Sequence, residues 1–84
     1  MNTGKLIAII DDEPDFLFTI SSILKRKGYS VITGSGDFGI SNILEKKPDL
    51  ILLDINMPGK SGSDICRQIK SEEVTHDIPV ILIS

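Results

Sequence analysis

The hydrophobic pattern of the chain alternates between two kinds of segment. Short apolar runs typical of β-strands occupy residues 6–10, 29–33, 49–54 and 78–84. The run at 6–10 is continuous, which is typical of a strand that is buried on both faces of a sheet. Between the runs, apolar residues recur at the three- and four-residue spacing of a helix with one buried face. The pattern therefore predicts strands and helices in strict alternation.

The predicted helices have recognisable ends. Pro14 stands where the first helix begins, a position that favours proline, and Gly28 stands where it stops. The second helix ends at Lys46 and Lys47. The apolar stripes consist of Phe16, Leu17, Ile20, Ile23 and Leu24 in the first helix, Phe38, Ile40, Ile43 and Leu44 in the second, and Ile65, Cys66 and Ile69 in the third. Phe18 falls off the first stripe, and we expect it to be an ordinary exposed aromatic residue.

Strands that alternate with helices predict an α/β fold with a parallel sheet and helices on its faces. In such sheets, ligands bind outside the carboxyl ends of the strands, where the winding direction reverses. Asp11 and Asp12 directly follow the first strand, and Asp54 ends the third. If the winding reverses between these two strands, the three carboxylates share one edge of the sheet.

The length, charge and cysteine content of the chain exclude several classes of protein. A chain of 84 residues with 40% hydrophobic and 25% charged residues is expected to form one globular domain. A net charge of −3 argues against a nucleic-acid surface, which requires clustered basic residues. The single cysteine, Cys66, excludes an internal disulfide, and the first apolar run is too short for a signal peptide or a membrane span. We expect a soluble, cytoplasmic protein without a membrane or nucleic-acid partner.

Three neighbouring carboxylates repel each other unless a cation joins them. Magnesium accepts one or two carboxylates, keeps several waters and leaves positions for a phosphate. A carboxylate can also act as a nucleophile and form an aspartyl phosphate. Asp11 also has a simpler interpretation, because an aspartate before a helix often caps it. A consecutive pair of aspartates at a strand end nevertheless favours a metal site.

Three motifs carry a resemblance to a known family. The stretches IIDDEPD (9–15), DLILLDINMPGKSG (49–62) and IPVILIS (78–84) resemble, in this order and spacing, the receiver domain of two-component response regulators. The resemblance covers the whole chain. It implies a flavodoxin-like, doubly wound parallel sheet with strand order 2-1-3-4, flanked by helices in three α/β/α layers.

The resemblance also implies roles for particular residues. Asp54 matches the phosphoacceptor, and Asp11 and Asp12 match the acidic pair that holds Mg²⁺ or Mn²⁺, with Asp12 as the direct ligand. Asn56 matches the residue whose backbone carbonyl completes the metal site together with Asp54. Ser84 matches the residue whose hydroxyl reaches the phosphoryl oxygen and takes part in the switch.

The implied function is two-component phosphorelay signalling. A sensor histidine kinase or a histidine phosphotransfer protein would donate the phosphoryl group, and the modified domain would act on a downstream effector domain or protein. We expect no enzymatic activity beyond self-directed phosphotransfer and dephosphorylation.

The chain departs from the family pattern at its end. Receivers normally continue through a fourth helix, a fifth strand with an essential lysine and a fifth helix, whereas this sequence stops at Ser84. We interpret residues 1–84 as a receiver domain that is incomplete at its C-terminus; a naturally short form is the alternative. The run at 78–84 would then be an exposed apolar edge strand, which predicts self-association. No lysine of this sequence matches the essential lysine of the family. The alternative function is therefore a phosphorylation-incompetent, receiver-like interaction module.

A second motif offers a different function. Residues Gly34 to Gly39 read GSGDFG, a literal G-x-G-x-x-G, and Asp54 lies twenty residues beyond Gly34. The motif and its distance from Asp54 match the sequence fingerprint of dinucleotide-binding proteins. The motif lies in the second strand-helix unit and explains neither IIDDEPD nor INMPGKSG, so a turn before a short helix is the simpler interpretation.

Overall fold

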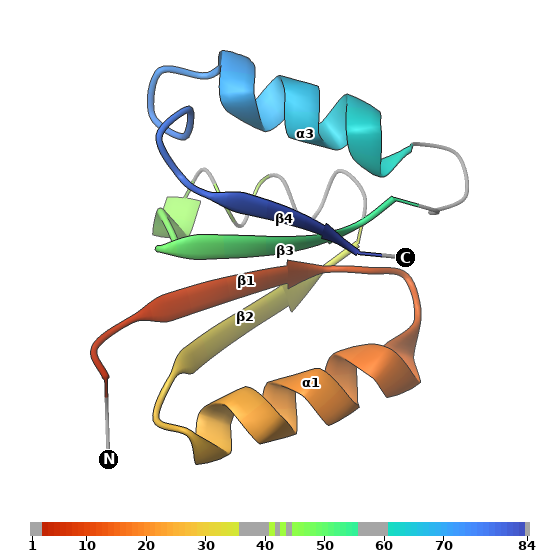
Figure 1. Ribbon diagram of the computed structural model, residues 1–84, viewed down its shortest axis with the longest axis vertical. Helices are drawn as coiled ribbons and strands as arrows, with labels where there is room; N and C mark the ends of the chain where they lie inside the picture. The colour runs from red at the N-terminus through yellow and green to blue at the C-terminus, as the bar shows by residue number, and fades with distance from the viewer. Residues whose placement is uncertain (1–2, 36–40, 42, 44, 56–60, 84) are drawn as a thin grey trace.

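The computed structural model describes residues 3–35, 41, 43, 45–55 and 61–83. The elements within these ranges are β1 (Leu6–Ile10), α1 (Pro14–Arg26), β2 (Ser30–Gly34), β3 (Leu50–Asp54), α3 (Gly62–Ser71) and β4 (Val80–Ile83) (Figure 1). Ser41, Ile43, Glu45 and Lys46 are also helical, inside the predicted second helix, whose other stripe residues lie outside the described part of the chain. None of the described helices has the length and apolar composition needed to cross a membrane.

The strands form one parallel sheet in the order β2-β1-β3-β4. After β1 the chain adds β2 on one side, then crosses over and adds β3 and β4 on the other. The winding direction therefore reverses between β1 and β3, as expected. This arrangement confirms the flavodoxin-like, doubly wound fold and its predicted strand order.

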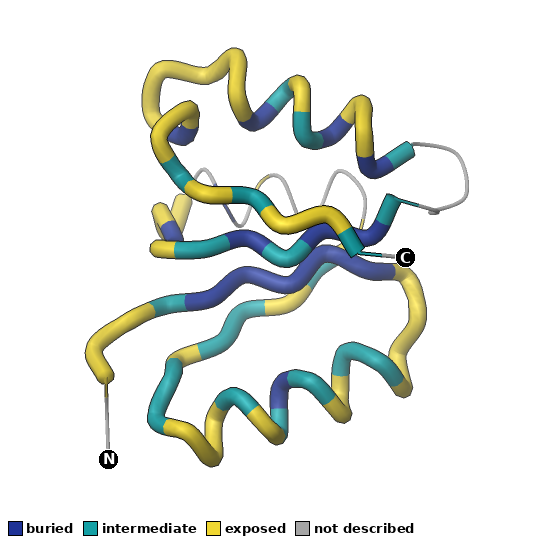
Figure 2. The backbone as a smooth tube through the Cα atoms, viewed as in Figure 1, coloured by how far each residue is buried: buried dark blue, intermediate teal, exposed yellow. Residues whose placement is uncertain are grey.

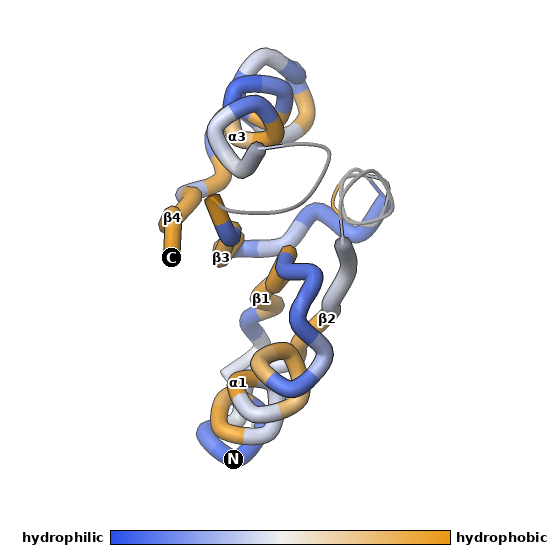
Figure 3. The backbone as a smooth tube through the Cα atoms, turned by 90° about the vertical axis from the view of Figure 1, so that its right-hand side faces the viewer, coloured by the Kyte–Doolittle hydropathy of each residue, from blue (hydrophilic) through white to orange (hydrophobic). Residues whose placement is uncertain are grey.

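Helices cover both faces of the sheet. In the view of Figure 1, α1 lies below the sheet and α3 above it. Figure 3, which is turned by a right angle, also shows α1 and α3 on opposite sides of the sheet. Ile43 belongs to the same buried cluster as Ile65 and Ile69 of α3, so it lies on the α3 side. The molecule thus has the three predicted layers, with α1 alone on its face among the described elements.

The main hydrophobic core lies between the sheet and α3, where the tube is dark blue in Figure 2. Its buried members are Ala8, Ile10, Ile43, Ile51, Leu53, Ile65 and Ile69. Full burial of each large aliphatic side chain contributes about 1.5–3 kcal/mol relative to an exposed one. This core fixes β1, which leads into Asp11, and β3, which ends at Asp54, against one helical layer.

Helix α1 begins and ends as predicted but is less buried than its stripe suggested. Gly28, just past its end, has a φ of 96°, a left-handed conformation that glycine adopts without strain. Phe18 is 75% exposed, in agreement with its position off the stripe. Ile23 was expected to face the sheet, yet it is 39% exposed. The helix is buried only at Ser21, because it lies over β2 and contacts little of the sheet beyond it.

The last strand starts later than predicted, at Val80 rather than Ile78. The N–H of Ile78 donates to the carbonyl of Thr75 at 3.0 Å, so this residue closes a turn. Pro79, which follows, has no N–H to offer to the sheet. The apolar character of Ile78 thus reflects packing against the core, not membership of the strand.

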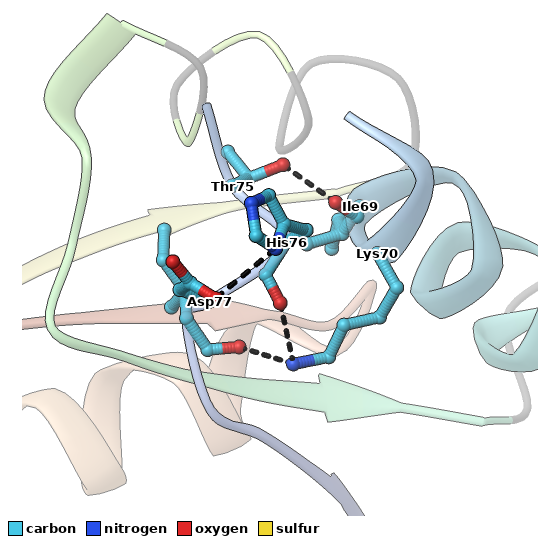
Figure 4. Close-up of polar contacts among 6 residues, drawn as sticks. Ile69, Lys70, Thr75, His76 and Asp77 are labelled. Carbon is cyan, nitrogen blue, oxygen red and sulfur yellow. Dashed lines mark hydrogen bonds and ion pairs between the residues drawn. The ribbon is translucent and has the colours of Figure 1, made fainter. Parts of the chain in front are cut away.

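The turn between α3 and β4 is anchored by two side chains (Figure 4). The hydroxyl of Thr75, which is fully buried, donates to the carbonyl of Ile69 at 2.6 Å. The Lys70 Nζ donates to the carbonyl of Ile78 at 2.6 Å and to that of His76 at 3.4 Å. These bonds fix the point at which β4 enters the sheet and so the register of its carboxyl end.

Candidate functional site

The backbone of the sheet brings two aspartates level with each other. Ile10 of β1 is in register with Leu53 of β3, so the next residues, Asp11 and Asp54, follow at the same edge. The N–H of Asp11 donates to the carbonyl of Gly34 at 3.0 Å, which extends the pairing of β1 with β2 by one residue. The positions of both aspartates are therefore set by the sheet itself.

The carboxylates of Asp11, Asp12 and Asp54 form a cluster in which one oxygen of each lies within 4.8 Å of the others. Asp11 is 6% exposed and Asp54 is 9% exposed, whereas Asp12 is open to solvent. This finding confirms that the acids predicted from two separate motifs share one edge of the sheet. Their roles in binding and chemistry do not follow from proximity alone.

The cluster borders a cavity of about 310 Å³. Its described lining consists of Asp11, Asp12, Glu13, Phe16, Asp54 and Ile83. None of these lining residues is basic, so the described wall carries only negative charge. A cavity with this lining favours a cation next to the three clustered carboxylates. Its volume leaves room for a phosphoryl group beside the cation.

Asp11 has a local role as well as a place in the cluster. Its Oδ1 accepts a hydrogen bond from the N–H of Glu13 at 2.9 Å, just before α1 begins. Asp11 is therefore not the N-cap of α1, which is Glu13, and its bond instead closes a turn just before the helix. A carboxylate has two oxygens with several lone pairs, so this bond is compatible with a second partner in the cluster.

The pKa of Asp11 is raised from its ordinary value of 3.8. Burial is the largest cause, because it disfavours the charged form, and the negative charges of Asp54 and Asp12 act in the same direction. The hydrogen bond from the Glu13 N–H opposes the shift. A divalent cation placed among the three acids would reverse the balance by favouring the charged form.

The oxygen cluster fits a small, hard cation. Mg²⁺ binds oxygen at about 2.1 Å in an octahedron, so two of its ligands lie at most about 4.2 Å apart. The 4.8 Å limit of the cluster is slightly wider. A small side-chain adjustment, or a water between one carboxylate and the ion, closes the difference, and magnesium usually keeps several waters.

Two predicted site residues, Asn56 and Ser84, lie outside the described residues. The structure does place their neighbours. The N–H of Ile55 donates to the carbonyl of Ile83 at 2.9 Å, so the residue before Asn56 and the residue before Ser84 are paired at the same edge as Asp54.

Sequence reasoning missed three residues that line the cavity. Glu13 is not among the predicted site residues, and Phe16 was assigned only to the apolar stripe of the first helix. Ile83 was considered only as a strand residue. The position of Glu13 and Phe16 just after the aspartate pair is the signal that could have found them.

The glycine-rich motif does not form part of this site. Gly34 is the last residue of β2, in register with Ile10, and the other glycines of the motif lie outside the described part of the chain. Asp54 belongs to the carboxylate cluster. The dinucleotide interpretation thus gains no support from the structure.

The fold and the edge cluster define a class of protein, and the comparison with known families agrees with it. A model of the family described as "Response regulator receiver domain" matches residues 7–84. The chain belongs to this family of two-component signalling domains, as the three motifs indicated.

Several known proteins are similar to the chain. It is 39% identical over 82 residues to the "Phosphate regulon transcriptional regulatory protein PhoB" of Pseudomonas aeruginosa. Among solved structures, it matches the N-terminal domain of a response regulator receiver protein from Methanoculleus marisnigri JR1, with a TM-score of 0.91 and 34% identity. It also matches the signal receiver domain of a signal transduction histidine kinase from Syntrophus aciditrophicus, with a TM-score of 0.85 and 31% identity.

The extent of these matches differs between the chains. The alignment covers 96% of this chain and 36% of the PhoB protein. It covers 95% of this chain against each of the two structures, but 66% of the Methanoculleus chain and 61% of the Syntrophus chain. The similarity therefore spans nearly all of this chain but only part of each of these relatives.

Proposed function

We propose that the chain accepts a phosphoryl group on Asp54 in a magnesium-dependent reaction and thereby serves in two-component signalling. One observation carries the proposal: Asp11, Asp12 and Asp54 come from distant parts of the sequence, yet their carboxylate oxygens lie within 4.8 Å of one another. Family membership supplies the expected chemistry for such a cluster at this edge of the sheet.

The proposed reaction is a direct transfer between two proteins. A carboxylate oxygen of Asp54 attacks the phosphorus of a phosphohistidine, a phosphorus–oxygen bond forms and the phosphorus–nitrogen bond breaks. The histidine ring leaves and takes up a proton. Such transfers depend mainly on in-line positioning and on cations that stabilise the developing charge. A bound Mg²⁺ would supply that charge stabilisation.

Each of the three clustered aspartates has a distinct task in this scheme. Asp12, which is exposed, is the direct ligand that reaches the ion from the solvent side. Asp11 is nearly buried, and the N–H of Glu13 holds one of its oxygens, so its carboxylate has a fixed orientation toward the ion. Asp54, at the end of β3, presents the nucleophilic oxygen to the cavity, and the carbonyl of Asn56 completes the ligand set.

The proposed donor is a sensor histidine kinase or a histidine phosphotransfer protein, because a phosphohistidine is the donor that this family uses. The transfer adds negative charge at the edge where β3 and β4 end. A hydroxyl at Ser84 would then bond the phosphoryl oxygen and couple the charge to the surface that an effector binds. The chain itself turns over no external substrate beyond its own phosphorylation and dephosphorylation.

The proposal is tested by incubating the chain with acetyl phosphate and Mg²⁺ and measuring its intact mass. We expect the wild-type chain to gain one phosphoryl group, and the gain to disappear when EDTA removes the metal. Asp54→Ala should gain nothing. Asp49→Ala is the matched control, because it removes the aspartate at the opposite end of the same strand and should still be modified.

Two results would contradict this function. A gain that persists in Asp54→Ala would place the acceptor on another residue. A folded wild-type chain that binds Mg²⁺ but never gains mass would instead favour the phosphorylation-incompetent interaction module.

A second proposal concerns self-association through β4. Within the described part of the sheet this strand pairs on one side only, with β3. Ile81 is 49% exposed and Leu82 is 47% exposed, although they point to opposite faces. The strand carries no charge or proline, the devices that usually protect an edge from pairing with another chain. A second copy could therefore add its own β4 at this edge.

A further inference from the structure

Gly62, the first residue of α3, contacts the peptide unit that follows Asp54. Its N–H donates to the carbonyl of Ile55 at 3.2 Å. On the other side, the N–H of Ile55 donates to the carbonyl of Ile83 at 2.9 Å. Ile55, the residue after Asp54, is therefore held by its carbonyl to the start of α3 and by its N–H to the end of β4.

The space around Gly62 admits no side chain. A Cβ atom added to this residue would lie 2.5 Å from the Cα of Ile55 and 2.8 Å from the carbonyl carbon of Asp54, and closer still to that carbonyl's oxygen. Carbon atoms in ordinary contact are about 3.5–4.0 Å apart, so one partner would have to move by about 1 Å. All of these atoms belong to the backbone and cannot rotate aside.

Close approach, not backbone conformation, explains the glycine. The φ of Gly62 is not in the left-handed region, unlike that of Gly28. Glycine is also less favourable than alanine within a helix, by roughly 0.5–1 kcal/mol. The benefit of glycine here must therefore come from the contact with the Asp54 peptide.

Neither partner can move without consequence. Ile65 and Ile69 hold α3 in the core, where they are 0% and 2% exposed. A shift of the helix would open this core, and a shift of the end of β3 would displace Asp54. Metal sites tolerate deviations of about 0.2 Å in ligand distance, several-fold less than the movement required.

We propose that Gly62 is a positioning residue for the phosphoacceptor site. Its lack of a side chain lets α3 lie against the Asp54–Ile55 peptide and so fixes the Asp54 carboxylate relative to Asp11 and Asp12. The inference rests on the proposed function of this cluster. It adds a residue that touches neither the ion nor the phosphoryl group.

The test compares Gly62→Ala with Ser63→Ala, a change at the next, exposed residue of the same helical turn. Calorimetric titration measures the affinity for Mg²⁺, and NMR reports the amide shifts of Asp54 and Ile55. We expect Gly62→Ala to weaken Mg²⁺ binding by about 10- to 100-fold, as changes around metal ligands do. Its rate of phosphorylation by acetyl phosphate should fall by about 100-fold, the effect of a misplacement of about 1 Å. Ser63→Ala should match the wild type.

A second pair of variants separates an effect on the position of Asp54 from an effect on stability. This pair also provides the test if Gly62→Ala does not fold. Ile65→Val and Ile69→Val each remove one buried methyl group from α3, at an expected loss of about 0.5–1.5 kcal/mol. Ile65 lies one turn closer to Gly62. We expect Ile65→Val to weaken Mg²⁺ binding, and Ile69→Val to leave it at the wild-type value although it is similarly destabilised.

The inference and the proposed function fail in different ways. If the wild-type chain neither binds Mg²⁺ nor takes up a phosphoryl group, the proposed function is wrong. If the wild type does both and folded Gly62→Ala matches it, Gly62 has no positioning role. Equal affinities in the two valine variants would likewise overturn the inference.

Discussion

The two aspartates on either side of the apolar part of β3, Asp49 and Asp54, differ in their surroundings and in their hydrogen bonds. The segment from Asp49 to Asp54 reads DLILLD, with an aspartate on each side of an apolar strand. Asp49 is exposed, and its Oδ2 accepts a hydrogen bond from the N–H of Leu6 at 2.8 Å. Asp54 is nearly buried and lies beside two further carboxylates.

The difference arises from the topology of a parallel sheet. At the amino ends of the strands, an isolated carboxylate can satisfy a backbone donor, as Asp49 does. At the carboxyl ends, the turns into the helices bring the side chains of several strands together where the winding reverses. The same side chain thus stabilises the fold at one edge and forms a candidate reaction site at the other.

The largest expected difference between the two ends is in metal-dependent stability. A ligand that binds only the folded state adds about 2.7 kcal/mol at one hundred times its dissociation constant. We expect saturating Mg²⁺ to raise the free energy of unfolding of the wild type and of Asp49→Asn by a similar amount, as measured by urea unfolding. Asp54→Asn should lose most of the gain. Equal gains in both variants would remove the distinction between the two edges.

The amino-end aspartate should matter more for the fold itself. Asp49→Ala leaves the N–H of Leu6 without its side-chain partner, which is expected to lower the free energy of unfolding by about 1 kcal/mol. The stabilisation by Mg²⁺ should stay unchanged. Urea unfolding with and without the metal checks both parts, and a loss of the Mg²⁺ response in Asp49→Ala would contradict the assignment.

The pH dependence of stability sharpens the comparison at the carboxyl end. The folded-state pKa of Asp11 is raised above its ordinary value of 3.8, so the folded protein holds this proton to higher pH than the unfolded chain. Stability therefore falls as pH rises from about 3.8 through the folded-state pKa, and the full penalty is present above it. Below both pKa values the penalty vanishes.

The variant Asp11→Asn removes this penalty and keeps an oxygen for the Glu13 N–H. In EDTA at pH 7 it should be more stable than the wild type, and the difference should shrink as the pH falls toward 4. Unfolding curves recorded across this range provide the measurement. A difference that does not vary with pH would mean that the charge of Asp11 is not the cause.

The smallest effect on stability is expected at the exposed edge of the sheet. Ile81→Lys changes a residue that is 49% exposed, so the free energy of unfolding should shift little. If β4 pairs with a second copy, however, the variant should reduce the dimer fraction seen by sedimentation velocity. Thr33→Lys, an exposed position on the opposite edge strand, is the control. A wild-type chain that stays monomeric at high concentration would exclude this mode of association.

Much of the fold follows from local patterns in the sequence. The apolar runs that became β1 and β3 are continuous and end in aspartates, so the rule for parallel sheets was sufficient to predict that Asp11 and Asp54 meet. The end of α1 was equally clear, because Gly28 has the conformation that a helix end requires. These features depend on residues close together in the sequence or on general topology.

Other features depend on tertiary packing and left no local signal. Ile23 has helical spacing, but its exposure depends on how much of the sheet α1 covers. Ile78 is apolar, yet its N–H bonds the carbonyl of Thr75 in a turn, so it precedes the strand. The role of Gly62 arises from the distance between α3 and β3, which the sequence does not reveal.

The most direct test of the cluster is to locate a bound ion by NMR. Mn²⁺ binds the same hard oxygen ligands as Mg²⁺ and broadens the signals of nearby nuclei. Asp49 and Asp54 are five residues apart along an extended chain, about 16 Å at about 3.3 Å per residue, so the two edges are distinguishable. We predict that substoichiometric Mn²⁺ removes the amide signals of Asp11, Asp12 and Asp54 first and spares Leu6 and Asp49. Broadening centred on other acids, such as Glu72 and Glu73, or spread evenly over the chain, would contradict a metal site at this edge.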